Sequence, residues 1–249
     1  MYQKVLQNGQ NYLELNRQTW LMNFNPNLEF INASVLDIPD ISISVYDFGV
    51  YAKFDNSYCT DGSFSIIKKD KENIRNFTLY KFDKTGKKLW SADKQYNGPV
   101  LYYGITHLPS GKPLLYANVD INNAQNAGDL YTVFNVAGKQ EAEFKTKYEG
   151  FISNVISVGD DYVVNFQFGL GEGKFGLKKI SSDGNELWRK TFGVKKSLSI
   201  ACIPTLDKGF AMLGYTKEYN AAYIDALIIK TDKNGNTEVV PKVYTKIAP

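Results

Sequence analysis

The sequence predicts an all-β fold built from short antiparallel strands. Three observations favour this fold. Tyr and Phe occur 17 and 15 times in 249 residues, and aromatic side chains suit the half-buried face of a sheet. Short apolar runs alternate with turn signals rich in Gly, Asn and Asp. The chain shows no amphipathic pattern of three helical turns, and only 122–128 has room for one turn.

Composition and charge exclude several classes of protein. A hydrophobic content of 43% is too high for a disordered chain. The 29 Lys and Arg against 26 Asp and Glu give a net charge of +3, too small to indicate a nucleic-acid partner. No apolar run approaches the ~20 residues that cross a bilayer. We therefore expect a folded monomer with no nucleic-acid partner and no transmembrane segment.

A turn motif recurs along the chain with a period near 50 residues. Each copy has an apolar strand, then Asp, Asn or Ser, and a glycine three positions later. The four glycines are Gly86, Gly138, Gly184 and Gly235. The polar side chain is expected to bond nearby backbone N–H groups, and the glycine to adopt a positive φ. A fifth, weaker copy at 20–30 has Asn27 in the glycine's place.

A second turn signal lies half a period away from the first, so each repeat holds two hairpins and four strands. Its copies, in chain order, are at Gly9, Gly62, Gly111, 159–161 and Gly209. Five units of four antiparallel strands predict a β-propeller, because stacked blades bury both faces of each sheet. We expect a single domain over 1–249, with blades at about 1–40, 41–97, 98–148, 149–194 and 195–249. A β-sandwich with similar turns is the alternative fold.

The segment 79–98, with Asp83, Gly86 and Trp90, resembles the tryptophan-docking repeat of quinoprotein-like (PQQ-like) propellers. The segments 177–193 and 200–236 resemble the more general propeller repeats of exported bacterial proteins. Trp returns only at Trp188, whereas the other copies have Ala142, Val239 and, roughly, Phe30. The resemblance implies a propeller scaffold. Nothing in the sequence matches the calcium and quinone ligands of quinoprotein enzymes, so no cofactor is expected.

The longer connections of such a propeller lie on one face, opposite the short turns, and binding residues tend to lie on loops held by a rigid scaffold. We expect a ligand site there, near the mouth of the central channel. Tyr and Asn combine stacking with hydrogen bonding, which suits a carbohydrate or a protein partner. The candidate binding residues are Asp120, Asn122, Asn123, Asp129, Tyr219, Tyr223, Asp225 and His107.

Catalytic and metal-binding patterns are not found in the sequence. His107 is the one histidine, and no Gly-x-Ser-x-Gly motif offers it a nucleophile. Cys59 and Cys202 lack partners at zinc spacing and are expected to be two buried thiols. The stretch 120–129 lacks the Asp or Asn and the Gly of a calcium loop. No catalytic residue and no metal site are therefore assigned.

The sequence accordingly predicts a non-enzymatic binding or scaffold propeller. The alternative is a five-bladed carbohydrate-active hydrolase with a carboxylate pair at the channel mouth, drawn from residues such as Asp47, Asp120 and Asp225. Two carboxyl groups ~5–9.5 Å apart in one pocket would favour the hydrolase. The strand pattern begins at Tyr2 with no leader before it. Two interpretations follow: the protein stays inside the cell, or the chain is a mature form. The resemblance to exported proteins favours a mature periplasmic or cell-surface chain. A third possibility is that the chain is part of a larger propeller.

Overall fold

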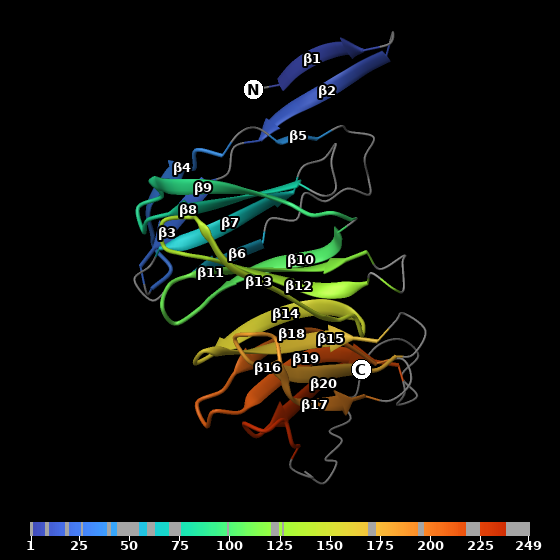
Figure 1. The fold of residues 1–249 in the computed structure, drawn as a ribbon. Helices are drawn as coiled ribbons and strands as arrows, with labels where there is room; N and C mark the ends of the chain where they lie inside the picture. Colours follow the sequence, from blue (N-terminus) through green and yellow to red (C-terminus); the bar gives the residue numbers. More distant parts are fainter. Residues whose placement is uncertain are drawn as a thin grey trace. The chain divides into compact units, whose positions relative to one another are not determined.

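Every regular element in the described part of the chain is a β-strand (Figure 1). The structure is a computed structural model. It describes residues 2–7, 10–17, 20–25, 27–38, 41–43, 55–58, 63–69, 76–98, 100–120, 125, 127–168, 173–193, 197–217 and 225–237. The chain forms two compact units, Met1–Phe144 and Lys145–Pro249. Within the described ranges, no helix has the length and apolar character needed to span a bilayer.

The first unit contains two four-stranded antiparallel meanders. The first comprises β6 (Asp55–Tyr58), β7 (Phe64–Lys69), β8 (Asn76–Phe82) and β9 (Lys88–Gln95). The second comprises β10 (Val100–His107), β11 (Pro113–Val119), β12 (Gly128–Phe134) and β13 (Gln140–Lys147), whose last residues pass into the second unit. Each sheet has the strand order of the chain, as a propeller blade does.

The N-terminal strands form two smaller sheets. In one, β2 (Gln10–Arg17) pairs with both β1 (Tyr2–Gln7) and β5 (Ile41–Ile43). In the other, β3 (Trp20–Phe24) pairs with β4 (Phe30–Val35). The described strands of 1–40 are thus divided between two sheets.

The second unit repeats the meander. One sheet comprises β14 (Phe151–Val158), β15 (Asp161–Gln167), β16 (Phe175–Ile180) and β17 (Glu186–Phe192). The other has β18 (Ser197–Pro204), β19 (Phe210–Thr216) and β20 (Asp225–Thr231). The all-β class and the four-stranded antiparallel blades of about 50 residues are confirmed. The blade boundaries and the single domain over 1–249 stay predictions.

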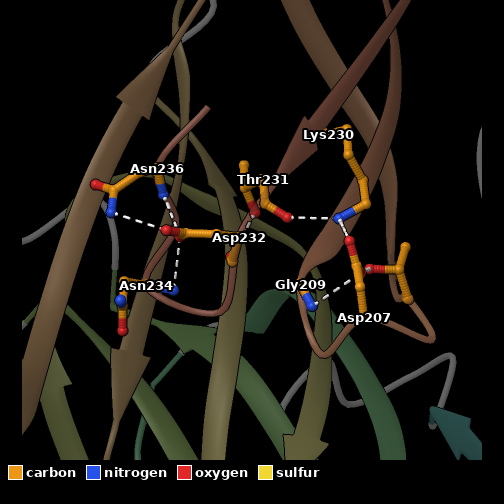
Figure 2. A network of polar contacts seen from close by, with 8 residues as sticks. Asp207, Gly209, Lys230, Thr231, Asp232, Asn234 and Asn236 are labelled. Atoms are coloured by element: carbon orange, nitrogen blue, oxygen red, sulfur yellow. Dashed lines mark hydrogen bonds and ion pairs between the residues drawn. The ribbon is translucent and has the colours of Figure 1, made fainter. Parts of the chain in front are cut away.

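The turn chemistry expected from the sequence is present in the repeats. Asp83 Oδ1 accepts the N–H groups of Thr85 at 2.8 Å and Lys87 at 3.0 Å. Figure 2 shows the same turn in the last repeat, where Asp232 Oδ1 accepts the N–H groups of Asn234 and Asn236 at 2.8 Å each. The four motif glycines all have a positive φ: Gly86 (86°), Gly138 (82°), Gly184 (89°) and Gly235 (76°). The first three turns close the hairpins β8–β9, β12–β13 and β16–β17, and the fourth follows β20, where Thr231 pairs with Thr237.

The fifth copy of the turn differs from the expectation in one residue. Asn25 opens it, accepting the N–H groups of Asn27 and Glu29 at 2.9 Å. The positive φ falls on Leu28 (63°), so the assignment of the glycine position to Asn27 was wrong by one residue. In the other copies the glycine lies three positions after the polar residue, and the residue three positions after Asn25 is Leu28. An exposed leucine therefore holds a backbone conformation that glycine adopts at lower cost.

The sheet β6–β9 is buried on both faces, as a blade inside a stack must be. Phe77 and Leu79 on β8 point to one face, and their cluster includes Tyr103 and Ile105 of β10. On the opposite face Phe64 and Phe82 stack with ring centroids 5.2 Å apart, beside Tyr80 and Leu36. The first strands of the two sheets, β6 and β10, lie in contact.

In the second unit the sheets β14–β17 and β18–β20 pack face to face in the same way, with β14 against β18. Their shared cluster contains Phe175, Leu177, Phe210 and Met212. A polar bridge adds to it at the first strands. The amide of Asn154 donates to the carbonyl of Cys202 at 2.8 Å and accepts its N–H at 3.0 Å. This single side chain therefore links the two sheets through a pair of hydrogen bonds to the backbone of Cys202.

A tryptophan joins consecutive sheets in each unit. Trp90 on β9 donates its Nε1–H to the carbonyl of Val136 at 2.8 Å, and a Cβ added to Gly138 would lie 2.7 Å from its ring. In the second unit, a Cβ added to Gly235 would lie 2.8 Å from the ring of Trp188. The turn glycine thus serves two needs, a positive φ and room for an indole.

Candidate functional site

Four of the eight predicted binding residues lie outside the described residues: Asn122, Asn123, Tyr219 and Tyr223. Cys59 and Asp47 lie outside them too. Of the others, Asp120, Asp129 and His107 belong to the first unit and Asp225 to the second. Asp225 opens β20 opposite Thr216 and is partly buried. The loop-face site stays a prediction.

Asp129 is an inward-facing residue of a strand, not a solvated loop residue. It is 1% exposed, stands opposite Asn118 on the neighbouring strand, and accepts that residue's amide N–H at 2.7 Å. Asn118 is itself fully buried. A buried carboxylate is tolerated where hydrogen bonds satisfy it, so this pair stabilises the β11–β12 hairpin.

Asp120 directly follows β11 and has an unusual backbone conformation. Its φ is 55°, in the left-handed region that Asp and Asn enter more readily than other residues. Its side chain lies over Gly98, where an added Cβ would be 1.5 Å from the Asp120 carboxylate oxygen. Gly98 is therefore required for this close approach.

His107 lies at the centre of a buried polar cluster in the first unit. Its Nε2 is 2.9 Å from Ser65 Oγ and 3.2 Å from Lys81 Nζ. Ser65 is fully buried, and Lys81 and His107 are each 7% exposed. Because an ammonium group only donates, Nε2 is the acceptor in the Lys81 contact, which places the imidazole proton on Nδ1.

A pocket of about 400 Å³ opens beside this cluster, within the first unit. Its lining combines apolar walls with hydroxyl and charged groups: Ser63, Lys81, Asp83, Lys84, Leu89, Trp90, Ser110, Gly111, Pro113 and Val136. This volume is in the usual range for small-ligand sites. The pocket lies among the short turns, whereas the sequence directed attention to the longer loops.

Lys81 and Ser65 were missed by sequence reasoning, although one signal for them existed. Lys81 interrupts the apolar strand β8, whose other residues from Phe77 to Phe82 are buried or half-buried. A lysine on the inward face of a strand needs an acceptor. His107, the acceptor, is 26 positions further along the chain.

A second pocket, of about 650 Å³, lies in the second unit and holds two carboxylates, Asp207 and Asp232. Lys230 donates to Asp207 at 2.7 Å, and this bond is the main cause of the lowered pKa of that carboxyl (Figure 2). The backbone N–H of Asn236 is the main cause of the lowered pKa of Asp232. Both groups are therefore held ionised inside turns.

Two further turn carboxyls of the described chain follow the same rule. The hydroxyl of Thr85 is the main cause of the lowered pKa of Asp83, and the hydroxyl of Ser181 has this effect on Asp183.

Cys202 is a buried free thiol, and burial raises its pKa to about 12. The described residues contain no group of three or more His, Cys, Asp or Glu side chains placed to hold a metal ion.

Comparisons with known proteins give structural likenesses only. No protein-family model and no curated protein matches the sequence. Among solved structures, a GH43 β-1,3-galactosidase is similar at TM-score 0.43 and 11% identity, covering 91% of this chain and 55% of its own. A second GH43 β-1,3-galactosidase, with galactodeoxynojirimycin, has TM-score 0.46 and 9% identity, covering 95% and 92%.

The β-propeller domain of the trilobed protease from Pyrococcus furiosus is also similar, at TM-score 0.46 and 12% identity, covering 88% of this chain and 64% of that one. The chain thus spans less than two thirds of the length of this protein and of the first galactosidase.

Proposed function

We propose that the protein is a non-enzymatic binding propeller that presents a carbohydrate or protein partner with a rigidly framed surface. The observation that carries the proposal is the pocket beside Lys81. It combines an indole wall, two serine hydroxyls and a nearly buried ammonium group, which is the mixture of apolar walls and a few fixed polar groups typical of ligand sites. The predicted binding residues Asp120, Asn122, Asn123, Asp129, Tyr219, Tyr223, Asp225 and His107 remain part of this proposal.

The two carboxylates of the second-unit pocket are not arranged as the acid of a glycosidase would be. A glycosidase needs one carboxylic acid that keeps its proton near neutral pH, and hence a raised pKa. Asp207 and Asp232 line one pocket, yet the pKa of each is lowered. Their hydrogen bonds favour the ionised form of both groups, whereas a general acid must hold its proton.

The scaffold supports the proposed role through its tryptophan contacts. Trp90 against Gly138 and Trp188 against Gly235 are the contacts that a tryptophan-docking repeat requires, and we infer that these repeats are of the quinoprotein-like type. Blades fastened in this way hold their turns in fixed positions, so a ligand meets a surface already organised for binding.

A binding screen tests the proposal. The protein is applied to glycan and peptide arrays, and each bound glycan is then incubated with the protein and analysed for released sugars. We expect binding without release. Ser110→Trp would fill the turn-side pocket and Tyr219→Ala with Tyr223→Ala would alter the loop face, so the variant that loses binding identifies the surface. Release of sugar that stops on Asp207→Asn or Asp232→Asn would refute the non-enzymatic assignment.

A further inference from the structure

The sheet β18–β20 carries an exposed aliphatic face, drawn in orange to red in Figure 1. In the row across its middle, Ala201 pairs with Leu213, and Leu213 pairs with Ile228. Cross-strand partners point to the same side of a sheet, so these side chains lie together. Leu213 is 49% exposed, Ile228 is 74% exposed, and Ile203 in the adjacent row is 60% exposed. Apolar side chains gathered in this way mark a surface of interaction.

The opposite side of the same sheet is its buried side. Cys202, Phe210 and Met212 belong there to the cluster shared with the sheet β14–β17. Their neighbours in the chain, Ile203 and Leu213, point the other way because side chains alternate along a strand. A strand added at either edge of the sheet would lie beside the aliphatic face and leave it uncovered. A second layer of structure is therefore needed to bury it.

Two other sheets of the chain show what covers the equivalent face. The residue four positions before the polar residue that opens the repeat's turn is Leu79, Leu177 or Ile228. Leu79 and Leu177 are 1% and 0% exposed, and each lies in a cluster that joins its sheet to the following one. Ile228 has the same place on its strand and the same kind of side chain. The aliphatic face of β18–β20 is therefore built like the faces that receive another sheet of this chain.

The charges on this face are paired with one another. Lys230, in the row beside Ile228, donates to Asp207 at 2.7 Å and to the carbonyl of Thr231 at 2.7 Å (Figure 2). The face thus offers a charged partner no net charge, and its aliphatic side chains offer a sugar no hydrogen bonds. A second copy of the same face brings the same apolar side chains and a neutral ion pair, so two such faces can meet without repulsion between like charges.

We propose that two copies of the chain associate through this face, sheet against sheet, about a two-fold axis. A two-fold contact uses the same residues of both copies, and apolar faces of two sheets commonly pack in this way. The face is small, so the dimer is expected to be reversible. A monomer was predicted from the sequence, and the dimer would correct that prediction. The inference goes beyond the proposed binding function, since a dimer presents each binding surface twice.

Sedimentation velocity of the full chain tests the dimer. Over concentrations from about 1 to about 500 µM, the average mass should rise from that of one copy towards that of two. Ile228→Lys should weaken association at least about tenfold, because each dimer would bury two ammonium groups without partners. Leu187→Lys is the matched control, since Leu187 is 51% exposed on β17, outside the face, and its change should leave association as in wild type. Thermal unfolding establishes that both variants fold.

A mixture of variants tests whether the face meets itself. Folded Ile228→Lys and folded Ile228→Asp should each associate poorly alone and form a mixed dimer together, because opposite charges then meet across the axis. A mixture that stays monomeric would refute the two-fold arrangement. A wild-type chain that stays monomeric over the whole concentration range would overturn the proposal, as would equal weakening by Leu187→Lys. These outcomes leave the proposed binding function standing, which the glycan and peptide arrays test separately.

Discussion

Two glycines with nearly the same backbone conformation separate the cost of a positive φ from the cost of losing the tryptophan contact. Gly138 has φ 82° and Gly111 has φ 79°. A Cβ added to Gly111 meets nothing within 4 Å, whereas one added to Gly138 would lie 2.7 Å from the ring of Trp90. Alanine at Gly111 therefore carries the backbone strain alone.

The magnitudes follow from these contacts. A left-handed conformation costs an alanine about 1–2 kcal/mol, which is the expected loss for Gly111→Ala. Gly138→Ala adds displacement of the indole, with loss of its hydrogen bond to Val136, about 0.5–1.5 kcal/mol, and of ring packing worth about 1 kcal/mol. We expect Gly138→Ala to lower the free energy of unfolding by roughly 2.5–4.5 kcal/mol.

Urea unfolding monitored by circular dichroism measures both changes. The same pair is then made in a Trp90→Ala background, where the indole is absent. There the two substitutions should cost equally, because only the backbone strain remains. If Gly111→Ala and Gly138→Ala cost the same in the wild-type background, the argument that the tryptophan sets the size of residue 138 is refuted.

Three other predictions follow from single residues. Leu28→Gly should raise the free energy of unfolding by about 0.5–1 kcal/mol by removing a strained φ; a urea midpoint below that of Leu28→Ala would contradict this. Because the pKa of Asp207 is lowered in the folded state, its contribution to stability is present above pH ~4 and declines as the pH falls below that value. The urea midpoints of wild type and Asp207→Asn should therefore differ at pH 6 and converge toward pH 2. A difference between the midpoints that stays constant with pH would contradict this prediction. In a Cys59→Ser background, Cys202 should react with a thiol reagent at pH 8 only on unfolding, since burial raises its pKa to about 12; labelling of the native protein at the rate of a free thiol would exclude this.

Local chemistry made the turns predictable from the sequence. A polar residue followed three positions later by Gly determines its own hairpin, because the hydrogen bonds from Asp83 or Asp232 reach only two and four residues along the chain. The same local rule shows why Leu28 went unnoticed. Asn27 resembles glycine in its tolerance of a positive φ and was therefore assigned to that position. The positive φ instead falls three residues after Asn25, on Leu28.

The candidate site was less predictable because its contacts join residues distant in the sequence. Ser65 and His107 are 42 positions apart, and their contact depends on how two sheets face one another. Asp129 was predicted to lie on a loop available to a ligand, whereas the pairing register places it on β12 across from Asn118. Pairing register and sheet packing decide both cases, and neither is contained in a short motif.

The contact between an indole and the following turn has an evolutionary consequence. Trp90 and Trp188 each fasten a sheet to its immediate successor, so a duplicated copy brings its own fastening with it. Duplication of one repeat therefore also copies the indole and the turn glycine that hold neighbouring sheets together.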